Sequence, residues 1–225
     1  MSEWLEERRR VLLTAQQLLE KRLTVGSSGN VSQRVGAELL AITPNRRYTE
    51  DLTPADIVIA TFEGDVVDGD GIPSSELMLH VGVYQARPEV QAVIHAHPRY
   101  VSAVAMTGRP IPPILEDQMI YLGGQIEVAA HAMSGSDELA AAAVLALGER
   151  NACLLANHGA LAVGRDLRAA LYACEYLEKL CLAFLWASLL GDPDVLPPEV
   201  VETEQAFFRM MQRTESELVG ARIRR

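Results

Sequence analysis

The sequence predicts one α/β or α+β domain, because helical and strand-like segments alternate without the regular order of βαβ units. The chain has 225 residues, the length of a single domain or of a domain with an arm. Hydrophobic residues make up 49% and charged residues 22%, a globular composition that excludes a disordered chain. We therefore expect a single domain over residues 1–225, with a C-terminal helical tail from about residue 197.

The first half of the chain begins with an amphipathic helix. Apolar side chains recur among charges at helical spacing over residues 3–23, and the turn-rich segment Gly26–Asn30 ends this helix. A second helix is predicted over 75–85, with Ser74 or Ser75 as the residue that caps its start. The strands predicted in this half are 31–34, 38–42 and 57–62, and exposed loops cover 44–50 and 64–73.

The second half contains further short strands and the predicted longest helix. Asp166 begins that helix, which extends to about Leu190, and an amphipathic helix over 200–217 follows several prolines. A tight turn is predicted at residues 157–159. The other predicted elements are strands 90–96, 153–156 and 160–163 and helices 100–106 and 138–148.

Charge and hydropathy exclude several classes of protein. Twenty Lys+Arg against 30 Asp+Glu give a formal charge of −10, which disfavours binding to nucleic-acid phosphates. The longest uncharged apolar run, Leu180–Leu190, has 11 residues, whereas a membrane span needs about 20. The N-terminus has no apolar run like that of a signal peptide, and three cysteines make no disulfide framework. We expect a cytoplasmic protein with neither nucleic acid nor membrane as a partner.

Two histidines stand two residues apart in the strand-like segment Ile94–Pro98. Alternate residues of a strand point to the same side, so His95 and His97 can present both imidazoles to one ion. Imidazole is a ligand of zinc and related metals, and a catalytic site takes about three protein ligands plus an open position. The alternative is a polar strand end without a metal.

A third histidine, His158, lies in the predicted tight turn, from which a side chain can point into a site. The alternative is a turn histidine that bonds only to backbone. His80 follows Glu76 by one turn of the predicted helix and fits either core or surface. His131 has no spacing typical of a ligand.

Two polar segments have the chemistry to bind an anion or to move a proton. A carboxylate at a helix start, as in Pro73–Glu76, serves beside a metal as ligand or proton acceptor. The neighbouring hydroxyls and helix amides favour an anion. The paired glycines of Gly26–Asn30 allow backbone N–H groups to converge as a phosphate nest. Taken alone, each segment is equally a plain cap or an ordinary loop.

Together these segments resemble a known family. In chain order they are Gly29-Asn30-Val31-Ser32, Ile42-Thr43-Pro44, Pro73-Ser74-Ser75-Glu76, His95-Ala96-His97 and Asn157-His158-Gly159. The set is similar to the class II (zinc-dependent) aldolases of the L-fuculose-1-phosphate aldolase and L-ribulose-5-phosphate 4-epimerase type, over roughly residues 5–190. The resemblance implies a central, mainly antiparallel sheet flanked by helices, and a homotetramer with sites at subunit interfaces.

The resemblance also implies a role for each matching residue. His95, His97 and His158 match the ligands of a Zn²⁺ ion, or of Mn²⁺ or Co²⁺ in its place. Glu76 matches the acidic residue that ligates the empty metal and then acts as acid/base. The residues that match the substrate-phosphate positions are Gly29, Asn30, Thr43, Ser74 and Ser75.

The implied activity is that of a lyase. A phosphorylated ketose similar to L-fuculose 1-phosphate is cleaved to dihydroxyacetone phosphate and an aldehyde, through an enediolate that the metal stabilises as a Lewis acid. Glu76 transfers a proton at the enediolate carbon. Lys21 and Lys179 are the only two lysines and lie far from the motifs in sequence, which argues against a Schiff-base route.

Other activities remain open within this family. The 4-epimerase carries Asp where Glu76 stands, which favours an aldolase. Arg46 or Arg47 offers a charge-assisted grip on phosphate or carboxylate, unless both are solvated. The alternatives are therefore a decarboxylase of 3-oxo-acid sugar phosphates, a sugar-phosphate 4-epimerase or dehydratase, and a scaffold protein like the adducin head domain.

Overall fold

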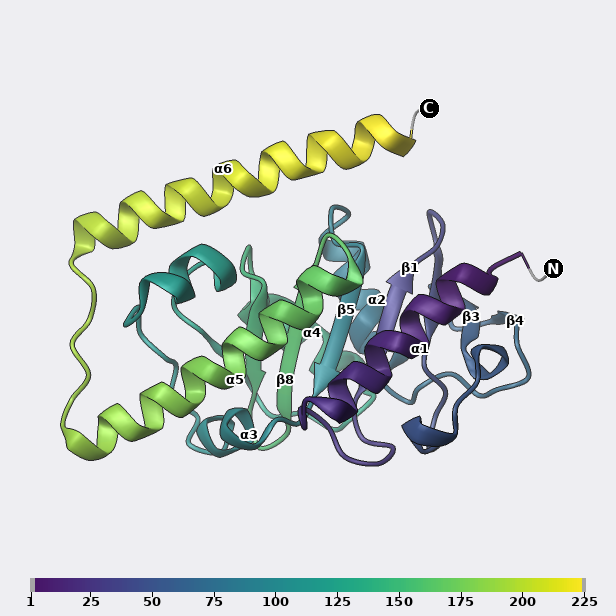
Figure 1. Cartoon of the computed structure of the whole chain (residues 1–225), viewed down its shortest axis with the longest axis horizontal. Coiled ribbons are helices and arrows are strands. Elements are labelled where there is room, and N and C mark those ends of the chain that lie inside the picture. The colour runs from purple at the N-terminus through teal and green to yellow at the C-terminus, as the bar shows by residue number, and fades with distance from the viewer. Residues whose placement is uncertain (1–2, 224–225) are drawn as a thin grey trace.

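An eight-stranded sheet lies at the centre of the molecule, between two layers of helices (Figure 1). The computed structural model describes residues 3–223, with side chains over residues 3–214. The strand order is β4-β3-β2-β1-β5-β8-β7-β6, and all neighbours are antiparallel except β6 and β7. The strands are β1 (Asn30–Arg34), β2 (Leu39–Ile42), β3 (Val58–Thr61), β4 (Val66–Asp68), β5 (Ala92–Ala96), β6 (Val128–Ala129), β7 (Ala152–Leu155) and β8 (Gly159–Gly164). The mainly antiparallel sheet flanked by helices is confirmed.

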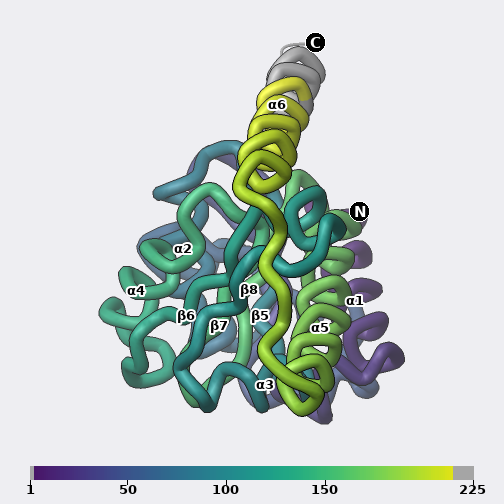
Figure 2. The backbone as a smooth tube through the Cα atoms, turned by 90° about the vertical axis from the view of Figure 1, so that its left-hand side faces the viewer, coloured from purple at the N-terminus to yellow at the C-terminus, as the bar shows by residue number. Residues whose placement is uncertain are grey.

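The helices cover both faces of the sheet. Helices α1, α3 and α5 pack on one face, and α2 and α4 pack on the other (Figure 2). The helices are α1 (Leu5–Glu20), α2 (Leu77–Ala86), α3 (Arg99–Ala105), α4 (Asp137–Leu147), α5 (Leu167–Leu190) and α6 (Pro198–Ile223). Short helical turns lie at η1 (Thr49–Asp51), η2 (Pro54–Asp56) and η3 (Gln118–Leu122). No helix of residues 3–223 is long and apolar enough to cross a bilayer.

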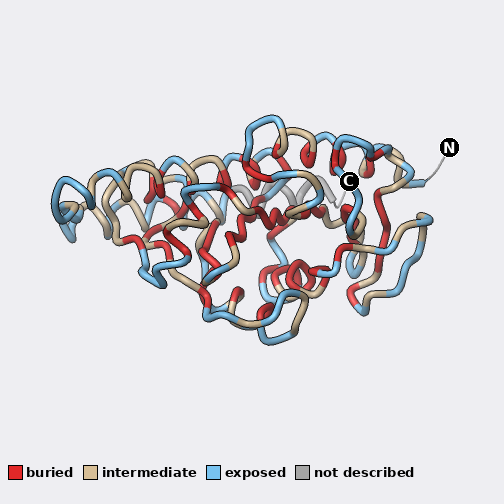
Figure 3. The backbone as a smooth tube through the Cα atoms, turned by 90° about the horizontal axis from the view of Figure 1, so that it is seen from below, coloured by how far each residue is buried: buried red, intermediate tan, exposed pale blue. Residues whose placement is uncertain are grey.

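Both faces of the central strands are buried, because helices cover each face (Figure 3). Strand β5 shows the pattern, since successive side chains of a strand point to opposite faces. Ile94 faces the core of α1, α3 and α5, whereas Val93 faces the core of α2 and α4. By the same alternation His95 lies on the α2 side, with 0% of its surface exposed. The strand therefore directs a histidine into the interior toward α2.

Three expectations about local structure are wrong. Helix α2 begins at Leu77 after Glu76, and neither serine caps it, because the Ser74 hydroxyl accepts the Glu76 N–H at 3.2 Å in a turn before the helix. Residues 64–73, expected to form an exposed loop, contain the edge strand β4, and both of its valines are exposed. Helix α6, with 26 residues, is longer than α5, with 24.

Helix α6 lies outside the two layers and docks on the η3 turn (Figures 1 and 2). Phe208 is the anchor, since it is 5% exposed and its ring lies against Gly123. Gln212 donates from its side chain to Asn151 at 3.0 Å. The connection before α6 is held by the Leu196 N–H, which donates to the Pro113 carbonyl at 2.8 Å.

Candidate metal centre

Three strands bring the candidate site together at one end of the sheet. His95, in β5, pairs across the sheet with Asn30, the first residue of β1, and with Leu161 of β8. His97 follows the end of β5, and His158 lies in the turn that immediately precedes β8. Because β1 and β8 both run antiparallel to β5, the end of β5 meets the starts of the other two strands.

The three imidazoles converge on one point. Their candidate ligand nitrogens all lie within 4.8 Å of one another. The Nε2 atoms of His95 and His97 are 2.8 Å apart. The ring centroids of His95 and His158 are 4.6 Å apart, and those of His97 and His158 are 5.1 Å apart. This spacing is suited to a single ion bound between the rings.

The contacts of His95 leave a place for a proton or a metal ion at this point. Its Nδ1 lies 2.9 Å from the Ala160 carbonyl, which can only accept, so Nδ1 carries a hydrogen. A neutral ring then has its lone pair on Nε2, and this atom lies 3.0 Å from Oε2 of Glu76. Two lone pairs at that distance repel each other unless a proton or metal ion lies between them. A backbone carbonyl that fixes the other ring nitrogen is typical of metal-binding histidines.

Glu76 is the carboxylate of the site, and it is 5% exposed. Its Oε2 accepts from Asn30 Nδ2 at 3.0 Å, and its Oε1 accepts from the Ser134 hydroxyl at 2.8 Å. Oε1 also lies 3.4 Å from Nε2 of His158. Burial raises the pKa of Glu76, but the hydrogen bond and charge of His95 and the bonds from Asn30 and Ser134 lower that pKa further. The carboxylate is therefore ionised at neutral pH.

His97 and His158 are held in the neutral form that binds metals. Burial, together with the charges of His95 and His158, lowers the pKa of His97 to about 4. Burial, with the charge of His95, also lowers the pKa of His158. Neutral imidazoles offer lone pairs at neutral pH, so a divalent cation need not displace protons from these two rings.

Two glycines allow the backbone to close around the histidines. Gly29 has φ +77°, and a Cβ there would lie 2.9 Å from the His95 carbonyl oxygen. A Cβ on Gly159 would lie 2.5 Å from both the Ala96 carbonyl oxygen and Cδ2 of His97. A larger residue at either position would push these atoms away from it. The two glycines therefore allow the Gly29 loop and the β7–β8 turn to lie close against the histidine strand β5.

A small cavity adjoins the site at the start of β1. Gly29, Asn30 and Thr43 line it together with Ser27, Ser28 and Arg47. Both Arg46 and Arg47 are exposed, but only Arg47 lines the cavity, and it is also paired with Asp56 at 2.9 Å. The Ser74 N–H donates to the Thr43 carbonyl at 3.2 Å, which places the Pro73–Glu76 segment beside this loop. Ser75 is exposed next to it.

Sequence reasoning missed Ser134 and did not decide the place of His80, and both lie near Glu76. Ser134 comes from a loop 58 residues away in the chain, and no local pattern marks it. His80, left open as core or surface, is fully buried and bonded to Asn30. The spacing of Glu76, His80 and Tyr84 every four residues was the available signal, because it places them on one helix face. His131 is exposed.

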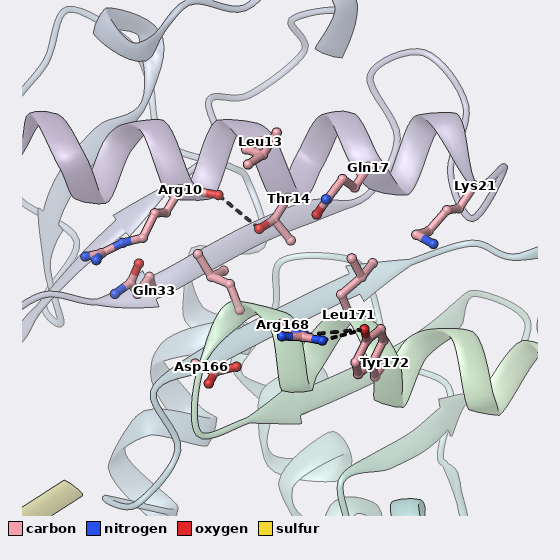
Figure 4. A pocket seen from close by; sticks show the side chains of 11 residues that line it. Arg10, Leu13, Thr14, Gln17, Lys21, Gln33, Asp166, Arg168, Leu171 and Tyr172 are labelled. Carbon is pink, nitrogen blue, oxygen red and sulfur yellow. Dashed lines mark hydrogen bonds between the residues drawn. The ribbon is translucent and has the colours of Figure 1, made fainter.

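A second cavity, of about 480 Å³, lies between α1 and the start of α5 (Figure 4). Its lining includes Arg10, Lys21 and Arg168, and none of the three clustered histidines. Arg10 and Lys21 are paired with Glu7 and Glu175 respectively, so most of this charge is already compensated. The candidate chemistry is at the histidine cluster and not in this larger cavity.

A mixed sheet that brings three histidines together around a buried carboxylate is typical of a metal-dependent enzyme. Comparison with known proteins identifies the family. Residues 9–185 match the model of the family described as "Class II Aldolase and Adducin N-terminal domain". The chain therefore belongs to this family, and it is a lyase of the class II aldolase type.

Individual relatives support this assignment over most of the chain. A 5-methylthioribulose-1-phosphate/5-deoxyribulose-1-phosphate aldolase of Rhodospirillum rubrum is 36% identical over 195 residues, which is 87% of each chain. An L-fuculose phosphate aldolase of Escherichia coli is 35% identical over 185 residues, covering 82% of this chain and 85% of that protein. A solved L-fuculose 1-phosphate aldolase superposes with a TM-score of 0.86 at 34% identity, covering 91% and 96% of the two chains.

Proposed function

We propose that this protein is a zinc-dependent aldolase that cleaves a ketose 1-phosphate to dihydroxyacetone phosphate and an aldehyde. The observation that carries the proposal is the convergence of three histidine nitrogens within 4.8 Å, beside an ionised and buried carboxylate. A scaffold protein has no need of such a set. The roles given below to individual residues are part of the proposal.

His95, His97 and His158 hold the metal, with Glu76 as a further ligand when substrate is absent. An imidazole set favours zinc, and Mn²⁺ or Co²⁺ are its alternatives. When bound, the divalent cation acts as a Lewis acid that stabilises negative charge on the ketose oxygens as the carbon–carbon bond breaks. The protein fixes His95 for this purpose through the Ala160 carbonyl, at 2.9 Å from Nδ1.

Glu76 moves the proton at the carbon next to the carbonyl. In the structure, contact with His95 is the main influence that keeps the pKa of this buried carboxylate low. When substrate displaces Glu76 from that contact, burial dominates and raises its pKa, so Glu76 can carry the proton that this carbon gains on cleavage and can remove it in the reverse reaction. Asn30 and Ser134 hold one carboxylate oxygen each during this change.

The substrate phosphate binds at the small cavity beside the site. Gly29, Asn30 and Thr43 line this cavity, and Ser74 and Ser75 lie on the adjoining segment. Arg47 supplies the positive charge that neutral donors lack. We assign this role to Arg47 and not to Arg46, because only Arg47 lines the cavity.

The relatives support a ketose 1-phosphate as the class of substrate. Their names give L-fuculose phosphate, 5-deoxyribulose 1-phosphate and 5-methylthioribulose 1-phosphate as the compounds those proteins act on. Purified protein is to be tested on these compounds, on L-ribulose 5-phosphate and on 3-oxo-acid sugar phosphates. We expect dihydroxyacetone phosphate from at least one ketose 1-phosphate, and loss of this activity on chelation. If the protein instead releases carbon dioxide, forms an epimer or dehydrates the substrate, the proposed aldolase activity is wrong and the protein is a decarboxylase, an epimerase or a dehydratase.

We also propose a homotetramer with its sites at subunit interfaces. Several large apolar side chains of α5 and α6 are exposed in the single chain, among them Trp186 at 62%, Leu190 at 92% and Met210 at 53%. Surfaces of this kind are typical of contacts between protein chains. Light scattering after gel filtration measures the mass, and a monomer at micromolar concentration would contradict the proposal.

A further inference from the structure

A chain of buried polar side chains leads from Glu76 into the interior between β1 and α2. We call it the polar ladder, and its members are Glu76, Asn30, His80, Ser32 and Tyr84. Asn30 bonds to Glu76 at 3.0 Å and to His80 at 2.5 Å. Ser32 bonds to Nδ1 of His80 at 2.7 Å and to the Tyr84 hydroxyl at 2.8 Å. All five residues are 7% exposed or less.

The geometry of helix α2 and strand β1 explains why side chains of the two elements alternate along the polar ladder. Residues four apart share one face of a helix, so Glu76, His80 and Tyr84 line α2 where it faces the sheet. Residues two apart share one face of a strand, so Asn30 and Ser32 both point toward α2. Side chains of the helix and of the strand therefore follow one another along the ladder.

The contact with the carboxylate shows in which direction every hydrogen bond of the ladder runs. An ionised Glu76 only accepts, so the amide of Asn30 must turn its Nδ2 toward it and its Oδ1 toward His80. Nε2 of His80 then carries the hydrogen. His80 is fully buried, and burial lowers its pKa to about 3, so the ring is neutral and its Nδ1 accepts. The single hydrogen of Ser32 points to Nδ1, which leaves Tyr84 as donor to Ser32.

The far end of the ladder is fixed by Arg34, away from the histidine cluster. Its Nη2 donates to the Tyr84 carbonyl at 2.6 Å, and its guanidinium carbon lies 4.9 Å from the centroid of the Tyr84 ring. This contact holds the third turn of α2 against the end of β1. Tyr84 and Ser32 consequently have little freedom to reorganise when the first members of the ladder are disturbed.

We infer that the polar ladder makes Ser32 and His80 positioning residues for the reaction, because they fix the Asn30 amide with its N–H group on Glu76. In the opposite tautomer of His80, Nε2 would accept, and the Asn30 amide would turn its oxygen toward the carboxylate. The resulting repulsion would displace Glu76 from its place beside His95. This inference rests on the proposed role of Glu76 as the group that moves a proton.

The first test observes the tautomer without any turnover. Imidazole ¹⁵N spectra of the metal-free protein report which nitrogen of His80 carries the hydrogen, and His80→Gln assigns the signal. We expect hydrogen on Nε2 alone in the parent protein, and a mixture of tautomers in Ser32→Ala, which removes the donor to Nδ1. A parent His80 with hydrogen on Nδ1, or an unchanged tautomer in Ser32→Ala, overturns the inference.

The second test separates kcat from KM. Partners that orient a catalytic or ligating group cost about 10–100-fold when removed. We expect kcat about tenfold lower in Ser32→Ala and up to about 100-fold lower in His80→Leu, with KM within about threefold. His80→Gln restores a donor toward Asn30 and recovers most of kcat. Because His80→Leu risks misfolding, Ser32→Ala is the deciding variant.

Thr14→Val is the matched control, because it also removes a buried hydroxyl, one that donates to the Arg10 carbonyl on α1 at 2.9 Å. Equal kcat in Ser32→Ala and the parent protein overturns the positioning role, and so does an equal loss in Thr14→Val. If the parent protein cleaves no ketose phosphate, the proposed function fails, and the tautomer measurement still decides the arrangement of the ladder.

Discussion

Replacement of Glu76 by glutamine removes the charge of the site and keeps nearly the same shape. The carboxylate has four polar neighbours: Asn30 Nδ2 at 3.0 Å, Ser134 Oγ at 2.8 Å, His95 Nε2 at 3.0 Å and His158 Nε2 at 3.4 Å. Glutamine keeps one acceptor, which suits Asn30, and turns its NH₂ toward Ser134, whose hydroxyl can rotate to accept. Hydrogen bonds to charged groups are stronger than neutral ones by about 1 kcal/mol each, so we expect the free energy of unfolding to fall by at most about 2 kcal/mol.

The effect of Glu76→Gln on catalysis is expected to be much larger. General acid–base groups contribute about 10²–10⁴-fold, which is roughly 3–5 kcal/mol of the barrier. We expect kcat to fall by that factor while three histidines retain about one metal ion per chain. Coupled detection of dihydroxyacetone phosphate gives kcat, elemental analysis gives the metal content, and urea titration gives the stability. Glu138→Gln makes the same chemical change at an exposed position of α4 and should leave kcat unchanged.

Three outcomes would refute the reasoning about Glu76. A kcat within about tenfold of the parent value would show that the proton is moved by another group. Loss of the metal together with activity would show that Glu76 serves mainly as a ligand. A fall in stability well beyond about 2 kcal/mol, with kcat lowered only in proportion to the folded fraction, would make its role structural.

Four further predictions concern the neighbouring contacts. Gly159→Ala forces the Ala96 carbonyl and the His97 ring apart, so we expect weaker zinc binding by competition titration and a loss of about 1–3 kcal/mol in stability; unchanged binding would contradict this. Arg47→Ala should raise KM for the phosphorylated substrate while Arg46→Ala does not, and equal KM values in both would remove Arg47 from the phosphate site. Phe208→Ala removes the anchor of α6, so limited proteolysis should cut α6 faster while the core unfolds at nearly the same temperature; a large fall in that temperature would show that α6 is part of the core. Burial, and to a smaller extent neighbouring histidines, lowers the pKa of His97 to about 4 and that of His80 to about 3. Below about pH 6.5 the unfolded chain therefore binds protons at these two histidines that the folded chain does not bind. Stability of the metal-free protein is therefore complete above about pH 6.5 and should fall toward pH 4 by at most about 1.4 kcal/mol per pH unit for each histidine, as urea titrations at several pH values will measure; a flat profile would contradict the assignment.

Local patterns explain why most elements could be predicted from the sequence. The helical spacing of apolar residues over 3–23 and the turn at Asn157–Gly159 depend on near neighbours in the chain, and the structure has α1 and the β7–β8 turn there. Asn157 adopts φ +57°, a conformation that asparagine tolerates in tight turns. The two missed strands, β4 and β6, have three and two residues, too few for a periodic signal.

The residues of the site show the same contrast between features that near neighbours in the sequence predict and features that distant contacts decide. The two-residue spacing of His95 and His97 follows from the period of a strand, and the structure places their Nε2 atoms 2.8 Å apart. Serine at the start of α2 misled the prediction because its hydroxyl has several local partners, and Ser74 bonds to the Glu76 N–H before the helix begins. Arg46 and Arg47 are identical neighbours in the sequence, so no local pattern separates them, whereas in the structure Arg46 adopts φ +52° and only Arg47 lines the cavity.

The sequence by itself determined the helices and strands, the acidic globular character and the order of the polar motifs, because these properties depend on composition and on neighbours a few residues apart. The tertiary structure decided which motifs meet. Burial of both faces of the sheet places β1, β5 and β8 side by side, so that Asn30 lies opposite His95, and the packing of α2 on that sheet brings Glu76 to them. Adjacency of this kind depends on contacts between residues tens of positions apart, which no local pattern records.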